Sequence, residues 1–236
     1  MANRKGVPMY QGKEAVPGPA AEICERIWLS IAERRLRPGT RLKEEQLAEV
    51  FDVSRARVRQ ALAMLESDGL VTILPNRGAF VSEPGVDEAR DVFHFRRQVE
   101  ARVVERLSSN ISEDALPRLE AHLALEREAD ARGDTTATIR LSGGFHMLLA
   151  ELAGSTFLTS MLRDLISRST LITTMYRRHS HHNCGPDEHA ALIDRIRARD
   201  LAGALEAMEQ HLRHVENELD LTEDVPVLRD LRDALV

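Results

Sequence analysis

Apolar residues recur at helical spacing near the start of the chain. Ile23, Ile27 and Ile31 follow one another at intervals of four residues and predict the buried face of a helix over 20–35. The segment 36–39 contains a proline followed by a glycine, which end a helix and begin a turn. The pattern therefore predicts a first helix with one apolar face.

Two further helices are predicted directly after this turn. The first spans 44–51, and its apolar stripe consists of Leu47, Val50 and Phe51. The second spans 55–68, with Ser54 as its N-cap and Gly69 as its C-terminal stop. One side of this helix is apolar and consists of Val58, Ala61, Leu62 and Leu65. The other side presents small and polar residues, which are Ala56, Gln60 and Ala63 with Arg57 and Arg59 beside them.

A small hairpin follows these helices. Residues 70–74 and 79–81 have the composition of short strands, and 75–78 has that of the turn between them. Helix, turn, arginine-bearing helix and hairpin in this order are typical of a winged helix-turn-helix, which binds double-stranded DNA. We therefore assign 18–82 to a DNA-binding domain and 83–87 to a linker.

The remainder of the chain has helical periodicity and no strand pattern. The expected helices cover 87–109, 113–132, 135–153, 155–176, 187–198, 200–221 and a short tail from about 225. We expect 88–236 to form an all-α bundle that binds a ligand and dimerises, so the fold class is mainly α. Residues 1–17 lack periodicity and are interpreted as a disordered arm, whose basic residues contact phosphates or remain an inert tail.

The composition fits a globular protein of two domains. Hydrophobic residues make up 43 % of the 236 positions and aromatic residues 4 %, so an aliphatic core is expected. The net charge of −6 implies that a basic DNA-binding face is offset by acidic surface elsewhere. Two distant cysteines, no apolar run of about 18 residues and no signal peptide favour a cytoplasmic protein with no membrane partner.

Polar residues at the start of the third helix and at the hairpin turn offer DNA-binding chemistry. An arginine can donate two parallel hydrogen bonds to a guanine edge, and the first N–H groups of a helix bind phosphate. An arginine at a wing tip enters a minor groove or contacts the backbone. The candidate DNA-binding residues are Ser54, Arg55, Arg57, Arg59, Gln60, Asn76, Arg77 and Gly78. The simpler alternative is that the helix arginines form a solvated face.

This region resembles the GntR family of bacterial transcriptional regulators over about residues 20–82. The segments that carry the resemblance are Arg37-Pro38-Gly39-x-Arg41-Leu42, Leu47-Ala48, Val53-Ser54-Arg55, Val58-Arg59-x-Ala61-Leu62 and Leu65-Glu66-x-x-Gly69-Leu70-Val71. The resemblance implies that Ser54, Arg55, Arg59 and the wing around Gly78 contact DNA. Family members usually have Thr-Pro or Ala-Pro after the Val-Ser-Arg, whereas this chain has Ala56-Arg57. Arg57 is therefore a departure that could alter operator preference.

The helical half resembles the FCD effector domain of the same family. The segments that carry this resemblance are Arg96-x-x-Val99-Glu100, Phe145-His146, Glu188-His189 and Ala207-Met208-x-x-His211-Leu212. Such domains usually bind a divalent metal through an Asp-x-x-x-His pair and two further histidines, which implies His146, His189 and His211 as ligands here. Three imidazoles with an open position suit Zn²⁺, with Ni²⁺ as the alternative. By spacing alone these would be ordinary helix histidines.

Ser142 stands one helical turn before His146, where the family usually has the aspartate. The loss of this carboxylate should weaken metal binding and leave the pocket more positive. The resemblance places Arg96 near the pocket, and a guanidinium pairs with a carboxylate through two hydrogen bonds. We therefore expect Arg96 and Ser142 to contact a small carboxylate effector.

A second group of metal-binding residue types lies between the helices expected at 155–176 and 187–198. It consists of His179, His181, His182 and Cys184, followed by His189. Because the spacing fits no closed zinc motif, we interpret this segment as a polar loop.

These features predict a ligand-responsive transcription regulator that is not an enzyme. We expect a repressor that binds a pseudo-palindromic operator as a homodimer. One alternative is a metal-dependent hydrolase with an attached nucleic-acid-binding domain, since three histidines can position an ion that activates water. The other is a constitutive DNA-binding protein whose bundle serves only for dimerisation.

Overall fold

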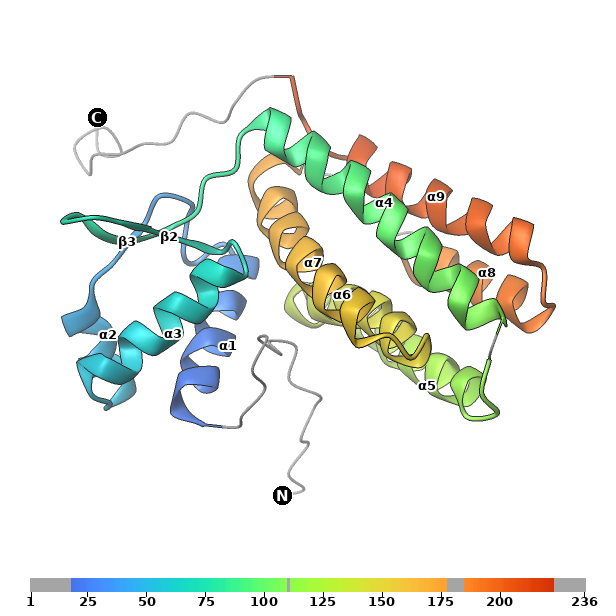
Figure 1. Cartoon of the computed structure of the whole chain (residues 1–236), viewed down its shortest axis with the longest axis horizontal. Helices are drawn as coiled ribbons and strands as arrows, with labels where there is room; N and C mark the ends of the chain where they lie inside the picture. The colour runs from blue at the N-terminus through green and yellow to red at the C-terminus, as the bar shows by residue number, and fades with distance from the viewer. Residues whose placement is uncertain (1–17, 110, 178–184, 223–236) are drawn as a thin grey trace. The chain divides into compact units, whose positions relative to one another are not determined.

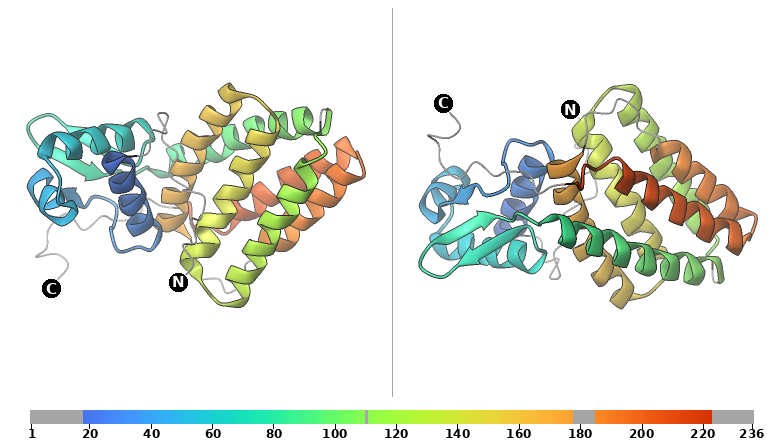
Figure 2. Two further views of the ribbon diagram at one scale, coloured as in Figure 1. Left: turned by 90° about the horizontal axis from the view of Figure 1, so that it is seen from below. Right: turned by 90° about the horizontal axis from the view of Figure 1, so that it is seen from above.

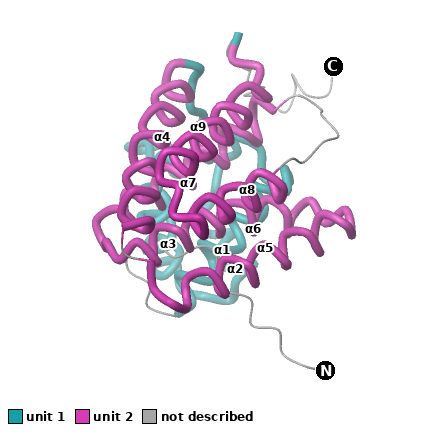
Figure 3. The backbone as a smooth tube through the Cα atoms, turned by 90° about the vertical axis from the view of Figure 1, so that its right-hand side faces the viewer, with its two compact units in different colours: residues 1–86, 222–236 teal, residues 87–221 magenta. Residues whose placement is uncertain are grey.

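The computed structural model describes residues 18–109, 111–177 and 185–222, which divide into two compact units. The first contains the described residues up to Val86 together with Thr222, and the second contains Asp87–Leu221 (Figure 3). The predicted N-terminal arm, the loop with His179 to Cys184 and the predicted tail from 225 lie outside the described residues.

The first unit is a helical domain with a small sheet (Figure 1). Its elements in chain order are α1 (Pro19–Ala32), β1 (Arg41–Leu42), α2 (Glu44–Phe51), α3 (Arg55–Ser67), β2 (Val71–Leu74) and β3 (Gly78–Val81). The sheet is antiparallel with the order β1-β3-β2, and Arg41 lies opposite Phe80. The predicted winged helix-turn-helix is confirmed. Strand β1 was not predicted, because two residues are too few to show the alternation of apolar and polar positions that indicates a strand.

The predicted buried faces of α1 and α3 form the core of this unit. The side chains of Ile23, Ile27 and Ile31 are at most 2 % exposed. The α3 residues buried against them are Val58, Ala61, Leu62 and Leu65. This packing leaves the opposite side of α3 facing solvent.

Two local predictions in this unit are wrong. Helix α1 ends at Ala32 instead of 35, because the chain already turns at Arg34, whose φ of 58° is left-handed. Val50 is 64 % exposed instead of part of an apolar stripe. Helix α2 packs on α3 without covering Val50. The Arg26 guanidinium lies 4.8 Å from the centre of the Phe51 ring.

The second unit consists of helices over its described length, as predicted. They are α4 (Val86–Ser109), α5 (Ala115–Ala131), α6 (Thr135–Leu152), α7 (Thr156–Tyr176), α8 (Gly185–Arg197) and α9 (Leu201–Asn217). Helix α9 ends four residues before the predicted 221, because the chain after it returns to the end of α7, where Asp220 N donates to Tyr176 O over 2.8 Å. In the described residues, no helix is both long and apolar enough to cross a membrane.

Helix α6 carries His146 and lies between two other helices of this unit. It packs against α5 and α7, while α8 packs against α5 and α9. Helix α4 lies beside α9 in both Figure 1 and Figure 2, and Arg97 of α4 forms an ion pair with Glu216 of α9. Phe145 of α6 lies in the aliphatic core, and the next residue, His146, is buried as well.

Candidate metal centre and nucleic-acid interface

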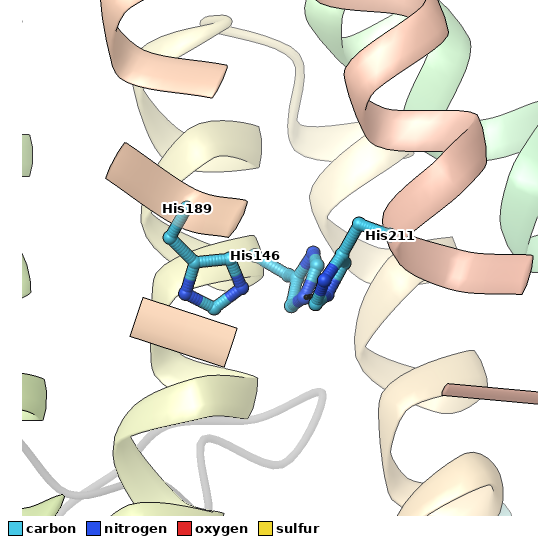
Figure 4. A group of neighbouring side chains, drawn as sticks. All are labelled: His146, His189 and His211. Carbon is cyan, nitrogen blue, oxygen red and sulfur yellow. Dashed lines mark hydrogen bonds between the residues drawn. The ribbon is translucent and has the colours of Figure 1, made fainter. Parts of the chain in front are cut away.

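Three histidines converge in the interior of the helical unit. His146 of α6, His189 of α8 and His211 of α9 are each at most 4 % exposed. Each offers one ligand nitrogen, and these atoms lie within 4.8 Å of one another. Figure 4 shows the side chains pointing toward one another from separate helices. The structure thus brings together the three residues that the resemblance implied.

Each of these histidines has its Nδ1 atom on a buried or partly buried carboxylate. The pairs are His146 with Glu100, His189 with Glu126 at 2.8 Å and His211 with Glu188 at 2.7 Å. With its proton on Nδ1, each ring donates to a carboxyl oxygen of its partner. The lone pair of each neutral ring is then on Nε2, which fixes the direction in which the ring can bind an ion.

The Nε2 atoms lie close enough together to bind one metal ion. Those of His146 and His211 are 3.2 Å apart, and two lone pairs at this distance repel unless a proton or cation lies between them. Two nitrogens bound to one tetrahedral Zn²⁺ lie about 3.3 Å apart. The Nε2 of His189 is buried and has no hydrogen-bond partner among the described residues. The residues present therefore fit a divalent ion such as Zn²⁺ or Ni²⁺.

The interior favours the uncharged form of the rings. Burial lowers the pKa of His146 well below its ordinary value, and the nearby charge of Arg96 lowers it further. Burial also lowers the pKa of His189 to about 3 and depresses the pKa of His211. Burial raises the pKa of Glu126 to about 8. Neutral imidazole is the form that ligates metals, so the rings need no deprotonation at neutral pH.

Arg96 is buried beside this centre, and its positive charge is already balanced. Its Nε donates to Glu100 Oε1 over 2.6 Å, and its Nη1 donates to Ser169 Oγ over 3.1 Å. Glu100 therefore bridges Arg96 and His146. Ser142 is partly buried on α6, one turn before His146. An effector-binding role for Arg96 or Ser142 stays a prediction.

The carboxylates that contact Nδ1 of the three histidines were not predicted from the sequence. Glu100 and Glu188 stand within the quoted motif segments, so a search for carboxylates near the implied ligands could have found them. Glu126 is 63 residues away from His189 in the chain, and their contact depends on the packing of α5 against α8. No local pattern carries that information.

The candidate DNA-binding residues of α3 are exposed around its N-terminus. Ser54 caps the helix, since its Oγ accepts from Arg57 N over 3.4 Å. The side chain of Arg57 donates to Gln60 Oε1 over 2.7 Å. Arg55 and Arg59 form ion pairs with acidic residues of α2, which sequence reasoning did not anticipate.

The wing carries the remaining candidates. Asn76 and Gly78 both have positive φ, of 60° and 96°, and shape the turn between β2 and β3. The Arg77 guanidinium lies 5.9 Å from the centre of the Phe80 ring. Nε of Arg41, on β1, lies 3.6 Å from the position that a Cβ on Gly78 would occupy. Arg41 is exposed, so it adds a cation to the wing that only the unpredicted strand β1 brings there.

Both units match known protein families. Residues 19–81 match the bacterial regulatory proteins of the gntR family, and residues 91–214 match the FCD domain. The HTH-type transcriptional repressor RspR of Escherichia coli K12 is 30 % identical over 183 residues, which cover 75 % of this chain and 78 % of RspR. The repressor NanR of Escherichia coli K12 is 29 % identical over 215 residues, which cover 82 % of this chain and 81 % of NanR.

A solved structure has the same architecture. The crystal structure of a GntR transcriptional regulator from Rhodococcus sp. RHA1 superposes with a TM-score of 0.71 at 26 % identity, covering 84 % of this chain and 95 % of that one. These relatives are transcriptional regulators and not enzymes, which removes the support for a hydrolase. The two family matches, one for each half, show that the chain belongs to the GntR family of DNA-binding transcriptional regulators, with an FCD domain as its helical half.

Proposed function

We propose that this regulator is a cytoplasmic repressor whose DNA binding responds to a small carboxylate bound beside a divalent metal ion. The observation that carries the proposal is the convergence of three buried histidines, each backed by a carboxylate. Two similar proteins, RspR and NanR, are named as repressors.

His146, His189 and His211 would hold the ion, with Zn²⁺ as the first candidate. When bound, the ion supplies positive charge and an open position for an anionic ligand. The chain's own residues prepare this site. Glu100, Glu126 and Glu188 orient the three rings, as carboxylates commonly do for metal-bound histidines.

Arg96 is the second element of effector recognition. Its side chain is held by Glu100 and Ser169, so an incoming carboxylate has to compete with Glu100 for the guanidinium. Such an exchange would alter the hydrogen bond between Glu100 and His146 as well. A ligand that favours one arrangement over the other is what allosteric control requires.

DNA recognition is assigned to α3 and the wing. In a homodimer, each copy would read one half of a pseudo-palindromic operator. Ser54, Arg55, Arg57, Arg59 and Gln60 are the α3 contacts that we propose, and Asn76, Arg77 and Gly78 are those of the wing.

The test begins with selection of duplexes from a random library by the full chain. We expect two inverted half-sites and a dimer by analytical ultracentrifugation. Affinity for the selected duplex is then measured with Zn²⁺-loaded and chelator-treated protein across a panel of small mono- and dicarboxylic acids. One class of acid should change the affinity about fivefold or more, and this response should disappear in His146→Ala. Specific DNA binding without any response to acids would favour the constitutive alternative.

A further inference from the structure

We propose that Glu44 is a positioning residue for DNA recognition, which orients Arg59 so that its terminal nitrogens face a base. The proposal rests on the assignment of α3 as the DNA-reading helix. Glu44 lies in the first turn of α2, and its side chain is 30 % exposed. It is thus a carboxylate placed directly beside the residues that have to approach an anionic duplex.

The contact between Glu44 and Arg59 has a specific geometry. Arg59 donates through Nε to Glu44 Oε2 over 2.8 Å. The structure gives no partner to its Nη1 and Nη2 atoms among the described residues. These two nitrogens carry the parallel N–H groups that can bind the O6 and N7 atoms of guanine together. One end of the guanidinium is therefore anchored while the recognition end remains available.

Arg55 has the opposite arrangement. Its Nη1 lies 3.3 Å from Glu45 Oε1, and its Nη2 lies 3.5 Å from Glu44 Oε2. Both terminal nitrogens of Arg55 thus face carboxylates, and Glu45 is the more exposed of these acids, with 77 % of its side chain accessible. Glu45 contacts Arg55 but not Arg59, which makes it a matched comparison for Glu44 in the same helical turn.

The carboxylate of Glu44 has two opposing effects on DNA binding. It repels phosphates, so it weakens binding to every duplex regardless of sequence. The Arg59 side chain is 63 % exposed and would otherwise sample many rotamers, and an anchored guanidinium loses less freedom when it binds a base. For the correct sequence, the anchoring of Arg59 therefore offsets the repulsion that Glu44 exerts on every duplex, and this difference between correct and incorrect sequences is how specificity arises.

The experiment compares Glu44→Gln with Glu45→Gln in the full chain, using the duplex selected by the wild type and a scrambled duplex. Each substitution removes one negative charge, so both should strengthen binding to the scrambled duplex by similar factors. Only Glu44→Gln should lower the ratio of specific to non-specific affinity, by about five- to tenfold. Glu44→Asp keeps the charge but withdraws the carboxylate, so it should lower the same ratio without strengthening non-specific binding.

Equal ratios for Glu44→Gln and Glu45→Gln would overturn the positioning role while leaving α3 as the DNA-reading helix. A wild-type chain that selects no preferred duplex would overturn both proposals, so the two failures are distinguishable. Unfolding midpoints of the three variants near that of the wild type would show that the ratios report on recognition.

Discussion

Arg96 donates through Nε to Glu100 over 2.6 Å, and both side chains are buried in the FCD domain. The second oxygen of the same carboxylate contacts Nδ1 of His146. The charge of a buried arginine and the orientation of a metal-ligand candidate therefore depend on one acidic side chain. Arg96, Glu100 and His146 therefore form one hydrogen-bonded network.

Arg96→Met should destabilise the fold by about 3–5 kcal/mol, because it leaves the charge of Glu100 buried without its main partner. Urea unfolding of the metal-free protein measures this loss. Arg102→Met on the same helix is the control, since the ion pair between Arg102 and Glu105 is exposed, and its loss should cost at most about 1 kcal/mol. Equal losses for the two variants would show that the buried pair contributes no more than the exposed one.

Glu126→Gln should lower metal affinity by about 10- to 100-fold, because a bound cation favours the ionised form of Glu126, and a neutral amide orients and polarises His189 less strongly than that carboxylate. Competition between the protein and a chromophoric chelator for Zn²⁺ measures the change. Glu128→Gln provides the comparison, because Glu128 lies on the same helix but pairs with Arg132 at the surface. If both variants bind Zn²⁺ as the wild type does, Glu126 has no part in metal binding.

Ser142→Asp should raise metal affinity, because it places a carboxylate one helical turn before His146. An anionic ligand adds electrostatic attraction to a divalent ion that a hydroxyl lacks. Ser142→Asn has nearly the same shape without the charge and should leave the affinity close to that of the wild type. The same chelator competition checks both variants, and equal affinities for Asp and Asn would exclude position 142 from the ligand sphere.

The winged domain was predictable because its signals are local. The N-cap Ser54 and the buried face with Val58 and Leu65 follow from spacing within one helix. The pairing of β1 with β3 could not be predicted in this way, because Arg41 and Phe80 are far apart in the chain. Local patterns therefore predicted the helix that we propose to read DNA, but not the Arg41 side chain that β1 brings to the wing.

In the candidate metal centre, too, some residues could be predicted from sequence motifs and others depend on contacts between distant parts of the chain. A family motif identified His146, His189 and His211, and the fold brings them together. The partner of His189 comes from α5, and its position is set by packing between helices. Likewise, the pairing of Glu44 with Arg59 depends on how α2 lies against α3. Both carboxylates, Glu126 and Glu44, therefore reach the predicted residues through packing between helices, which leaves no local pattern in the sequence.

Asp200 gives a prediction for pH. The backbone N–H of Gly203 and then the Arg195 side chain lower the pKa of this N-cap of α9, the helix that carries His211. A carboxylate with a lowered folded-state pKa contributes stability above its unfolded pKa of 3.8, and this contribution is lost as pH falls further. Asp200→Asn should therefore destabilise the protein at pH 5 and do so less at pH 3, as measured by urea unfolding. A difference independent of pH would assign the effect to packing alone.

The wing should contribute affinity without sequence preference. Arg41 and Arg77 lie beside Gly78 and Phe80 at the hairpin, where a cation can contact a phosphate. Arg41→Ala and Arg77→Ala should each weaken binding to selected and scrambled duplexes alike. Each should also lower the slope of log affinity against log salt by about one.

The matched control for the wing is Arg213→Ala on α9, where the exposed arginine pairs with Glu209 in the FCD domain. This variant removes the same charge from the chain as a whole, so its salt slope separates a local phosphate contact from a change in net charge. If Arg41→Ala and Arg213→Ala give the same slope as the wild type while Arg77→Ala lowers it, only the tip of the wing touches the duplex. If all three slopes equal that of the wild type, neither wing arginine contacts phosphate, and α3 alone would supply the ionic part of DNA binding.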